Sequence, residues 1–144
     1  MNRIPTERDI NVFDSLDEIH AVKHFLGKNL EEAEKLFQAN FLSYQEDLMW
    51  MGPVAFAYYI IAAMNYLKSP ISSDNSDAVN CFCSLIEFKL SYEESSLIPV
   101  ASAIVETIHL MIADFQQFEI ETWIYGDLKA KLITLSEEIH KKLK

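Results

Sequence analysis

The chain has 144 residues, half of them hydrophobic, and a net charge of −10 from 22 acidic and 12 basic side chains. This length predicts one domain with a substantial core, and the apolar content excludes a disordered chain. The acidic balance excludes nucleic acid and anionic membrane as expected partners, because both attract basic surfaces. With only three glycines and four prolines, the composition favours long helices over a turn-rich β-sandwich.

Residues 1–14 are mostly polar and are predicted to form an N-terminal arm, with Ile10, Val12 and Phe13 docking on the core. Residues 15–144 are predicted to form a single all-helical domain. The first residues contain no apolar run of signal-peptide length, so we expect a cytoplasmic location.

Three helix starts are predicted before residue 50. Ser15 to Glu18 fits a capping box, followed by an apolar stripe at Leu16, Ile19, Val22 and Leu26 and a left-handed end at Gly27. Asn29 is predicted to cap a second helix, which Asn40 can end. Ser43 to Glu46 matches a second capping box and predicts a third, short helix.

The segment Met51–Ser69 (MGPVAFAYYIIAAMNYLKS) predicts a helix over residues 53–68. Proline is tolerated in the first helical turn, and the proline after Ser69 disfavours helical backbone there. Since the segment is apolar on nearly every side, we expect it to be the buried central helix. A membrane span is the alternative, but Pro53 leaves this helix shorter than the roughly 17–25 apolar residues that a span needs.

Three further helices are predicted in the second half of the chain. One begins at Ser76 or Asp77 and has two apolar faces, so it either lies between other helices or forms a homo-oligomer interface through residues 81–88. Cys81 and Cys83 are expected to be reduced and to act as small hydrophobic residues. A long helix follows Pro99, and Asp127 caps a last helix with an apolar seam at Leu128, Leu132, Leu135, Ile139 and Leu143.

No segment alternates with the period of a strand, so the predicted fold is all-α. We expect an irregular bundle of about six or seven helices around the buried central helix over residues 53–68.

Histidines near acidic residues are typical of metal centres, but the positions of the histidines in this sequence do not favour one. An acid-x-x-His pattern occurs at Asp17/His20, Glu106/His109 and Glu137/His140, but helical periodicity turns all three pairs towards solvent. His20 and His24 are four residues apart, yet two ligands do not make a tetrahedral site and no third is evident. The glycine-rich nucleotide motifs and the serine nucleophile motif are absent. We therefore expect no metal, no cofactor and no catalytic residue.

The segment from Tyr44 to Met51 (YQEDLMWM) combines carboxylates with large apolar groups. Tyrosine, tryptophan and methionine are enriched at interfaces, and adjacent carboxylates suit a basic partner. Tyr44, Glu46, Asp47 and Trp50 are therefore the candidate partner-binding residues. Alternatively, Tyr44 and Trp50 pack under the bundle while both carboxylates stay solvated.

The stretch from Leu36 to Ser69 (LFQAN…YQEDLMWMGPVAFAYYIIAAMNYLKS) resembles a pattern in small uncharacterised bacterial proteins. In these an acidic-aromatic segment precedes a proline-led A-F-x-Y-Y helix, and some resemble immunity proteins, which bind and neutralise a toxin. The resemblance implies a bacterial origin and an all-helical fold, and it implies no catalytic residue.

The leading hypothesis is a non-enzymatic protein-binding module, an immunity-type inhibitor of a basic partner protein. A small-molecule- or metal-dependent enzyme is the alternative, with a pocket between helices at Tyr58, Tyr59 and Asn65. Self-association through residues 81–88 is the third hypothesis.

Overall fold

A computed structural model describes residues 3–120 and 122–143. The described residues form helices and no strands, as predicted: α1 (Glu7–Ile10), α2 (Leu16–Phe25), α3 (Leu30–Ala39), α4 (Phe41–Trp50), α5 (Pro53–Lys68), α6 (Ser76–Tyr92), α7 (Ala101–Ala113), α8 (Thr122–Tyr125) and α9 (Leu128–Leu143). Three 3₁₀ segments connect them: η1 (Pro70–Ser72), η2 (Glu94–Val100) and η3 (Phe115–Phe118). Within this described part, seven α-helices have ten residues or more, which confirms the predicted bundle.

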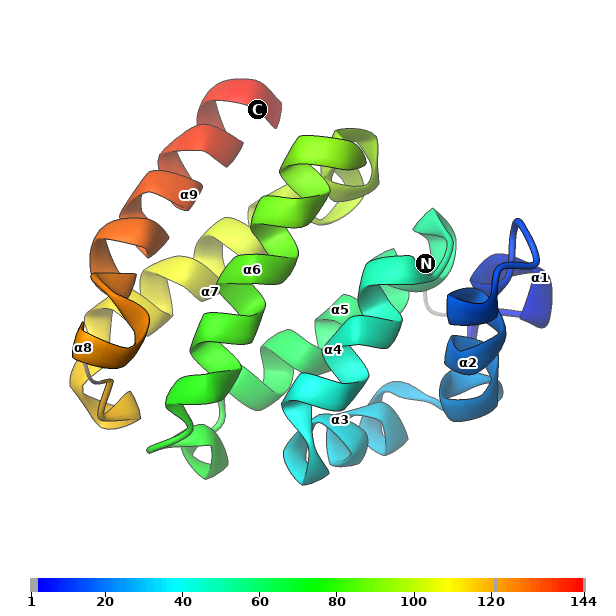
Figure 1. The fold of residues 1–144 in the computed structure, drawn as a ribbon, viewed down its shortest axis with the longest axis horizontal. Helices are drawn as coiled ribbons and strands as arrows, with labels where there is room; N and C mark the ends of the chain where they lie inside the picture. Colours follow the sequence, from blue (N-terminus) through cyan, green and yellow to red (C-terminus); the bar gives the residue numbers. More distant parts are fainter. Residues whose placement is uncertain (1–2, 121, 144) are drawn as a thin grey trace.

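The helices α2, α4, α6 and α9 succeed one another across the molecule, each packed on the next, and α5 and α7 lie behind them (Figure 1). The central helix α5 has the predicted bounds and contacts α1, α3, α4 and α7. Its buried residues include Phe56, Tyr59, Ile60 and Leu67. Burial of a side chain of this size contributes about 1.5–3 kcal/mol, so this helix is a principal source of stability.

The predicted caps are confirmed at three helices. Ser15 and Glu18 form a capping box at α2, Asn29 and Glu32 form one at α3, and Asp127 Oδ1 accepts the Ala130 N–H at 3.0 Å in α9. The predicted capping box at Ser43 is wrong, because α4 already begins at Phe41. Asn40 ends α3 and its side chain also caps α4. This single residue therefore replaces the connection predicted between the end of the second helix at Asn40 and the start of the third at Ser43.

The predicted apolar stripe of the first helix is also wrong. Leu16 is 85% exposed and Ile19 is 48% exposed, whereas α2 buries Glu18, Ala21 and Phe25. The predicted docking of Phe13 on the core is wrong as well, because Phe13 is 85% exposed. With Leu16 and Ile19 it leaves apolar side chains on solvent. Of the predicted stripe only Val22 packs against the core, and the carboxylate of Glu18 occupies one of the inner positions of α2.

That carboxylate fixes the connection from α1 to α2. Glu18 accepts hydrogen bonds from the backbone N–H groups of Val12, Phe13 and Ser15, at 2.8–3.1 Å, and from the Ser15 hydroxyl. Burial raises the pKa of Glu18, but these hydrogen bonds outweigh it and hold the pKa below its ordinary value. Residues 7–10 of the predicted arm form α1, which packs on α5 through buried Ile10.

The first turn of α5 approaches the arm so closely that only glycine fits at position 52. The Gly52 N–H donates to the Ile10 carbonyl at 2.9 Å. A Cβ at Gly52 would lie 2.4 Å from the Asp9 carbonyl oxygen and 2.6 Å from Val12 Cγ2. Both distances are shorter than any ordinary contact.

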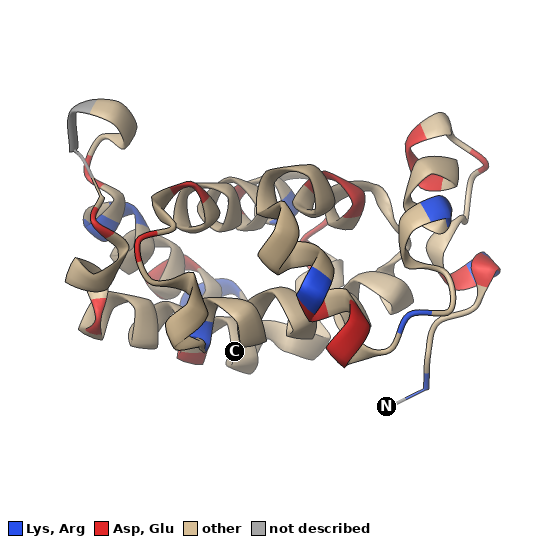
Figure 2. Ribbon diagram, turned by 90° about the horizontal axis from the view of Figure 1, so that it is seen from below, with Lys and Arg blue, Asp and Glu red and all other residues tan. Residues whose placement is uncertain are grey.

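One helical stretch of the described chain, Glu94–Ala113, is long and apolar enough to cross a membrane by length and composition alone. Half of that window is buried in the bundle, and the core helix of a soluble protein passes the same test. Acidic residues lie on several helices and at the end of the molecule formed by α1 and α2 (Figure 2).

Gly52→Ala should lower the free energy of unfolding by about 1–3 kcal/mol, because the arm must move away from α5 to admit the methyl group. Urea denaturation of the two proteins measures this difference. Gln38→Ala, at an exposed position of α3, is the matched control and should stay near wild type. Equal stability of Gly52→Ala and wild type would show that the arm is not docked on α5.

Glu18→Gln should cost about 2 kcal/mol at neutral pH, because hydrogen bonds to a charged acceptor are the stronger kind. The folded-state pKa is lowered, so this stabilisation is present above the ordinary value of 4.5 and is lost as the pH falls through the folded-state pKa. The stability difference from wild type should therefore shrink towards acid pH in denaturation series. Glu137→Gln, at an exposed position, should show almost no difference, and a pH-independent gap for Glu18→Gln would contradict the charge argument.

Candidate functional site

The structure divides the four candidate partner-binding residues between two faces of α4. Glu46 and Trp50 are four residues apart and both are exposed, with Trp50 at 43%. Tyr44 and Asp47 are three apart and face α2, where Tyr44 is half-buried and Asp47 is buried. Only Glu46 and Trp50 therefore lie on the expected surface, and the burial of Asp47 contradicts both interpretations of the segment, which kept its carboxylate in solvent.

On the outer face, Trp50 continues into a row of aromatic side chains that α6 contributes. The Trp50 and Phe88 ring centroids are 5.3 Å apart in an edge-to-face arrangement, and those of Phe88 and Tyr92 are 5.1 Å apart. Tyr92 is 76% exposed. We call these three side chains the aromatic ledge. From the sequence, Phe88 was placed only in the self-association face 81–88 and Tyr92 was not singled out, because both belong to a different helix, which packs beside α4 (Figure 1).

A buried lysine underlies this part of the molecule. Lys89 is fully buried, and its Nζ donates to the Met49 carbonyl at 2.9 Å and to Glu93 Oε1 at 2.8 Å. The same ammonium lies 4.7 Å from the centre of the Phe56 ring. Burial lowers the pKa of Lys89, and the Glu93 carboxylate counteracts that effect. Lys89 thus joins the last turn of α4 to α6 and fixes the position of the ledge.

On the inner face, Asp47 meets two histidines of α2. His24 Nδ1 lies 2.7 Å from Asp47 Oδ2, and His20 Nδ1 lies 3.4 Å from Asp47 Oδ1. The His24 ring also lies edge-on to Tyr44, with centroids 5.2 Å apart. The third polar residue beside the two histidines, which the sequence did not reveal, is therefore Asp47. From the sequence, Asp47 was assigned to the surface that contacts another protein.

The three residues of the predicted pocket do not line one cavity, although the Tyr58 and Tyr59 rings lie edge-on with centroids 4.9 Å apart. Tyr59 is buried, its hydroxyl lies 2.8 Å from the carbonyl oxygens of Phe25 and Lys28, and burial raises its pKa. Asn65 donates to Glu34 Oε2 at 3.1 Å. Of the three, Tyr58 lines a groove of about 570 Å³. The other lining residues of this groove are Arg3, Leu30, Pro53, Val54, Ala57, Ile61, Pro99 and Val100. Apolar side chains dominate this lining, and acid–base chemistry would have to rely on Tyr58 and Arg3.

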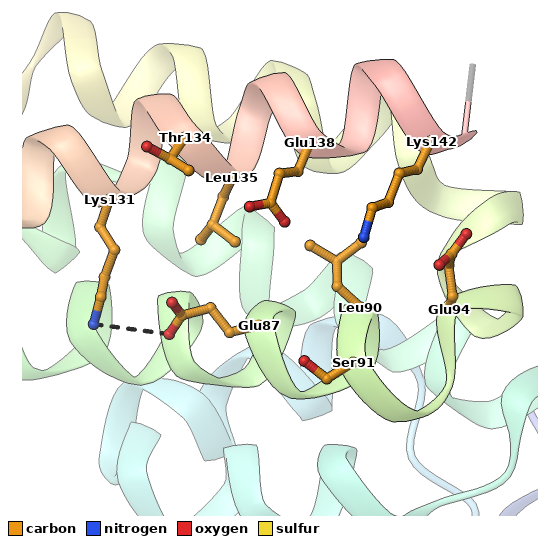
Figure 3. Close-up of a pocket in the computed structure, with 9 residues that line it drawn as sticks. All are labelled: Glu87, Leu90, Ser91, Glu94, Lys131, Thr134, Leu135, Glu138 and Lys142. Atoms are coloured by element: carbon orange, nitrogen blue, oxygen red, sulfur yellow. Dashed lines mark ion pairs between the residues drawn. The ribbon is translucent and has the colours of Figure 1, made fainter.

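A second groove, of about 650 Å³, lies between α6 and α9 (Figure 3). Glu87 and Glu94 on one side face Lys131, Glu138 and Lys142 on the other, and Lys131 pairs with Glu87 at 3.7 Å. Periodicity predicts the apolar seam of the last helix, but it does not show which charged residues of α6 lie beside that helix, so this groove was not predicted. The charges of the two sides largely compensate one another, so the groove offers no strong field for a ligand of either sign.

The remaining sequence predictions about reactive groups agree with the structure. The three acid-x-x-His pairs are exposed at all six residues. Cys81 and Cys83 are free and buried, and burial raises their thiol pKa values to about 11 and about 12. Both thiols therefore stay protonated at neutral pH and pack as small apolar groups.

The helix with two apolar faces lies between others, as one of its two interpretations predicted. α6 packs against α4 on one side and α9 on the other. Cys81 and Leu85 are buried within the monomer and Phe88 is half-buried. Of the apolar residues Cys81, Leu85 and Phe88, Phe88 therefore remains the one accessible to another molecule.

Comparison with known proteins gives no relative from which to transfer a function: no family model, no curated protein and no solved structure matches the chain.

Lys89→Ala should lower the free energy of unfolding by about 2–4 kcal/mol, because it leaves a cavity and an unsatisfied Met49 carbonyl. The matched control is Lys131→Ala, which breaks an ion pair with about half-exposed partners. That change should cost less than about 1 kcal/mol. Guanidinium denaturation measures both, and similar values for the two variants would contradict a structural role for the buried ammonium.

Proposed function

We propose that the protein is a non-enzymatic binding module that holds a basic partner protein on the aromatic ledge. The observation that carries the proposal is the exposure of Trp50 and Tyr92 on a rigid base. Their rings are 43% and 76% exposed, and the half-buried Phe88 ring lies between them. Tryptophan and tyrosine are the residues most often found as interface anchors.

The charge around the ledge supports a basic partner. Glu46 is exposed and lies one turn before Trp50. Glu93 and Glu94 directly follow Tyr92 and are exposed as well, although Glu93 is paired with the Lys89 ammonium. The net charge of the whole chain, −10, has the same negative sign. A lysine- or arginine-rich partner would be steered to this side, and its cations can stack on the exposed rings.

The resemblance of residues 36–69 to bacterial immunity-like proteins supports a narrower version, in which the partner is a toxin that this protein neutralises. Inhibition by binding needs no catalytic residue, only a rigid complementary surface. We place the complex in the cytoplasm as part of the same proposal.

The small-molecule version of the enzyme alternative rests on the Tyr58 groove, which has no carboxylate, histidine or cysteine among its lining residues. Self-association through residues 81–88 has only the Phe88 edge to use, because Cys81 and Leu85 are buried. Both alternatives therefore find less support than the ledge does.

Affinity purification from the native cell lysate tests the proposal when wild type is compared with Trp50→Ala/Tyr92→Ser. Wild type should retain one stoichiometric basic protein, and the double variant should bind it at least roughly tenfold more weakly, because anchor residues cost at least about 2 kcal/mol when truncated. Both chains should show the same circular dichroism and melting temperature, since neither side chain is buried.

Ile71→Ser is the matched control, because Ile71 is 62% exposed but lies at the far end of α5. It should bind like wild type. Glu46→Lys should lower the association rate constant and flatten its salt dependence. A partner that the ledge variant retains in full would place docking elsewhere, with the exposed face at Phe13 and Leu16 as the next candidate.

A further inference from the structure

Two histidines and one aspartate converge where α2 packs on α4. His20 and His24 are four residues apart, so both imidazoles lie on one face of α2. Asp47 projects from the inner face of α4 and meets both rings. The ring centroids are 4.5 Å apart, and one ligand atom from each of the three residues lies within 4.8 Å of the other two.

We propose that His20, His24 and Asp47 bind one divalent transition-metal ion of the zinc class. The ligand atoms would be the Nδ1 atoms of both histidines and one carboxylate oxygen. A tetrahedral zinc ion with bonds of roughly 2.0–2.2 Å places its ligand atoms about 3.4 Å from one another. The separation of His20 Nδ1 from Asp47 Oδ1 already has this value, 3.4 Å.

The second separation is a hydrogen bond rather than a ligand edge. His24 Nδ1 and Asp47 Oδ2 are 2.7 Å apart. The two separations end on different carboxylate oxygens, so the Asp47 carboxylate would turn to present one oxygen to the ion. The ion would replace the hydrogen-bonded proton, and the gap to His24 would widen by about 0.7 Å to reach the tetrahedral edge. Rotation of the partly exposed His24 ring is enough for a displacement of that size.

The burial of the three side chains gives the site an inner and an outer side. The Asp47 side chain is 4% exposed, that of His24 is 29% exposed and that of His20 is 62% exposed. The anion therefore lies at the protected base of the site, and the fourth coordination position faces solvent. Imidazole nitrogens favour zinc, copper and nickel, whereas calcium and magnesium require more oxygen ligands than this site supplies.

The site is distinct from the aromatic ledge. Asp47 and Trp50 are three residues apart on α4, but Asp47 contacts His24 of α2 and Trp50 contacts Phe88 of α6, so an ion at Asp47 would tie α2 to α4 without covering the ledge. Metal binding and partner binding can therefore succeed or fail separately.

The test is a calorimetric titration of the chelator-treated full chain with zinc sulfate, repeated with cobalt(II) as a spectroscopic probe. We expect one equivalent of zinc per chain and, with cobalt, the visible absorption of a tetrahedral N/O complex. His20→Ala should weaken zinc binding at least roughly tenfold, since even residues outside the first ligand shell cost that much. The exposed position of His20 leaves the fold unchanged.

The matched control is His109→Ala/His140→Ala, which removes the other two of the four histidines of the chain. It should bind zinc like wild type. Asp47→Asn should also lose affinity, with circular dichroism as the check that the variant folds. Absence of saturable zinc binding by wild type at about 100 µM protein, equal affinity of His20→Ala and wild type, or loss of binding in the control would each overturn the proposal.

Discussion

The burial of α5 is the constraint on which the rest of the structure depends. A helix of 16 residues with apolar groups on nearly all sides cannot rest on one neighbour. α1, α3, α4 and α7 all contact it, and the Phe25, Phe37 and Tyr59 rings pack at its α2–α3 side. The requirement extends to single atoms at Gly52, where the arm passes too close for a side chain. The positions of α2 and α4, and thus of both proposed binding surfaces, follow from this wrapping.

Local chemistry explains what the sequence could predict of the fold. The prolines at 53 and 70 bound α5, and Ser15, Asn29 and Asp127 begin their helices as expected, because a cap depends on atoms within three residues of chain. The errors arose where two local solutions compete. Asn40 can serve two helices at once, so the capping match at Ser43 was redundant.

The mistaken stripe of α2 has a different cause. Periodicity identifies an apolar face but not the element that covers it, and Leu16 and Ile19 face solvent. Glu18 occupies an inner position because four hydrogen-bond donors surround its carboxylate. A hydropathy scale ranks glutamate as a surface residue and does not include such hydrogen bonds. For the same reason the sequence offered no third ligand for His20 and His24. Asp47 follows His24 by 23 residues, and only the packing of two helices brings them together.

The helix α4 converts one short segment into two surfaces with different chemistry. Glu46 and Trp50 remain exposed, with Trp50 against Phe88 of α6, whereas Tyr44 and Asp47 contact His24 of α2. Lys89 fixes the outer surface from beneath, and the two histidines of α2 hold the inner one. The sequence predicted one acidic-aromatic patch from neighbouring residues of a single segment. In the structure the ledge combines Trp50 of that segment with Phe88 and Tyr92 of α6.

Site-specific photo-crosslinking in living cells tests most directly whether the ledge contacts a partner. A photoreactive phenylalanine analogue replaces Tyr92 in one strain and the exposed Ile71 in another. The account predicts a covalent adduct with a single basic protein from position 92 and none from position 71. An adduct only with a second copy of this chain, or a partner captured from position 71 and not from position 92, would contradict it.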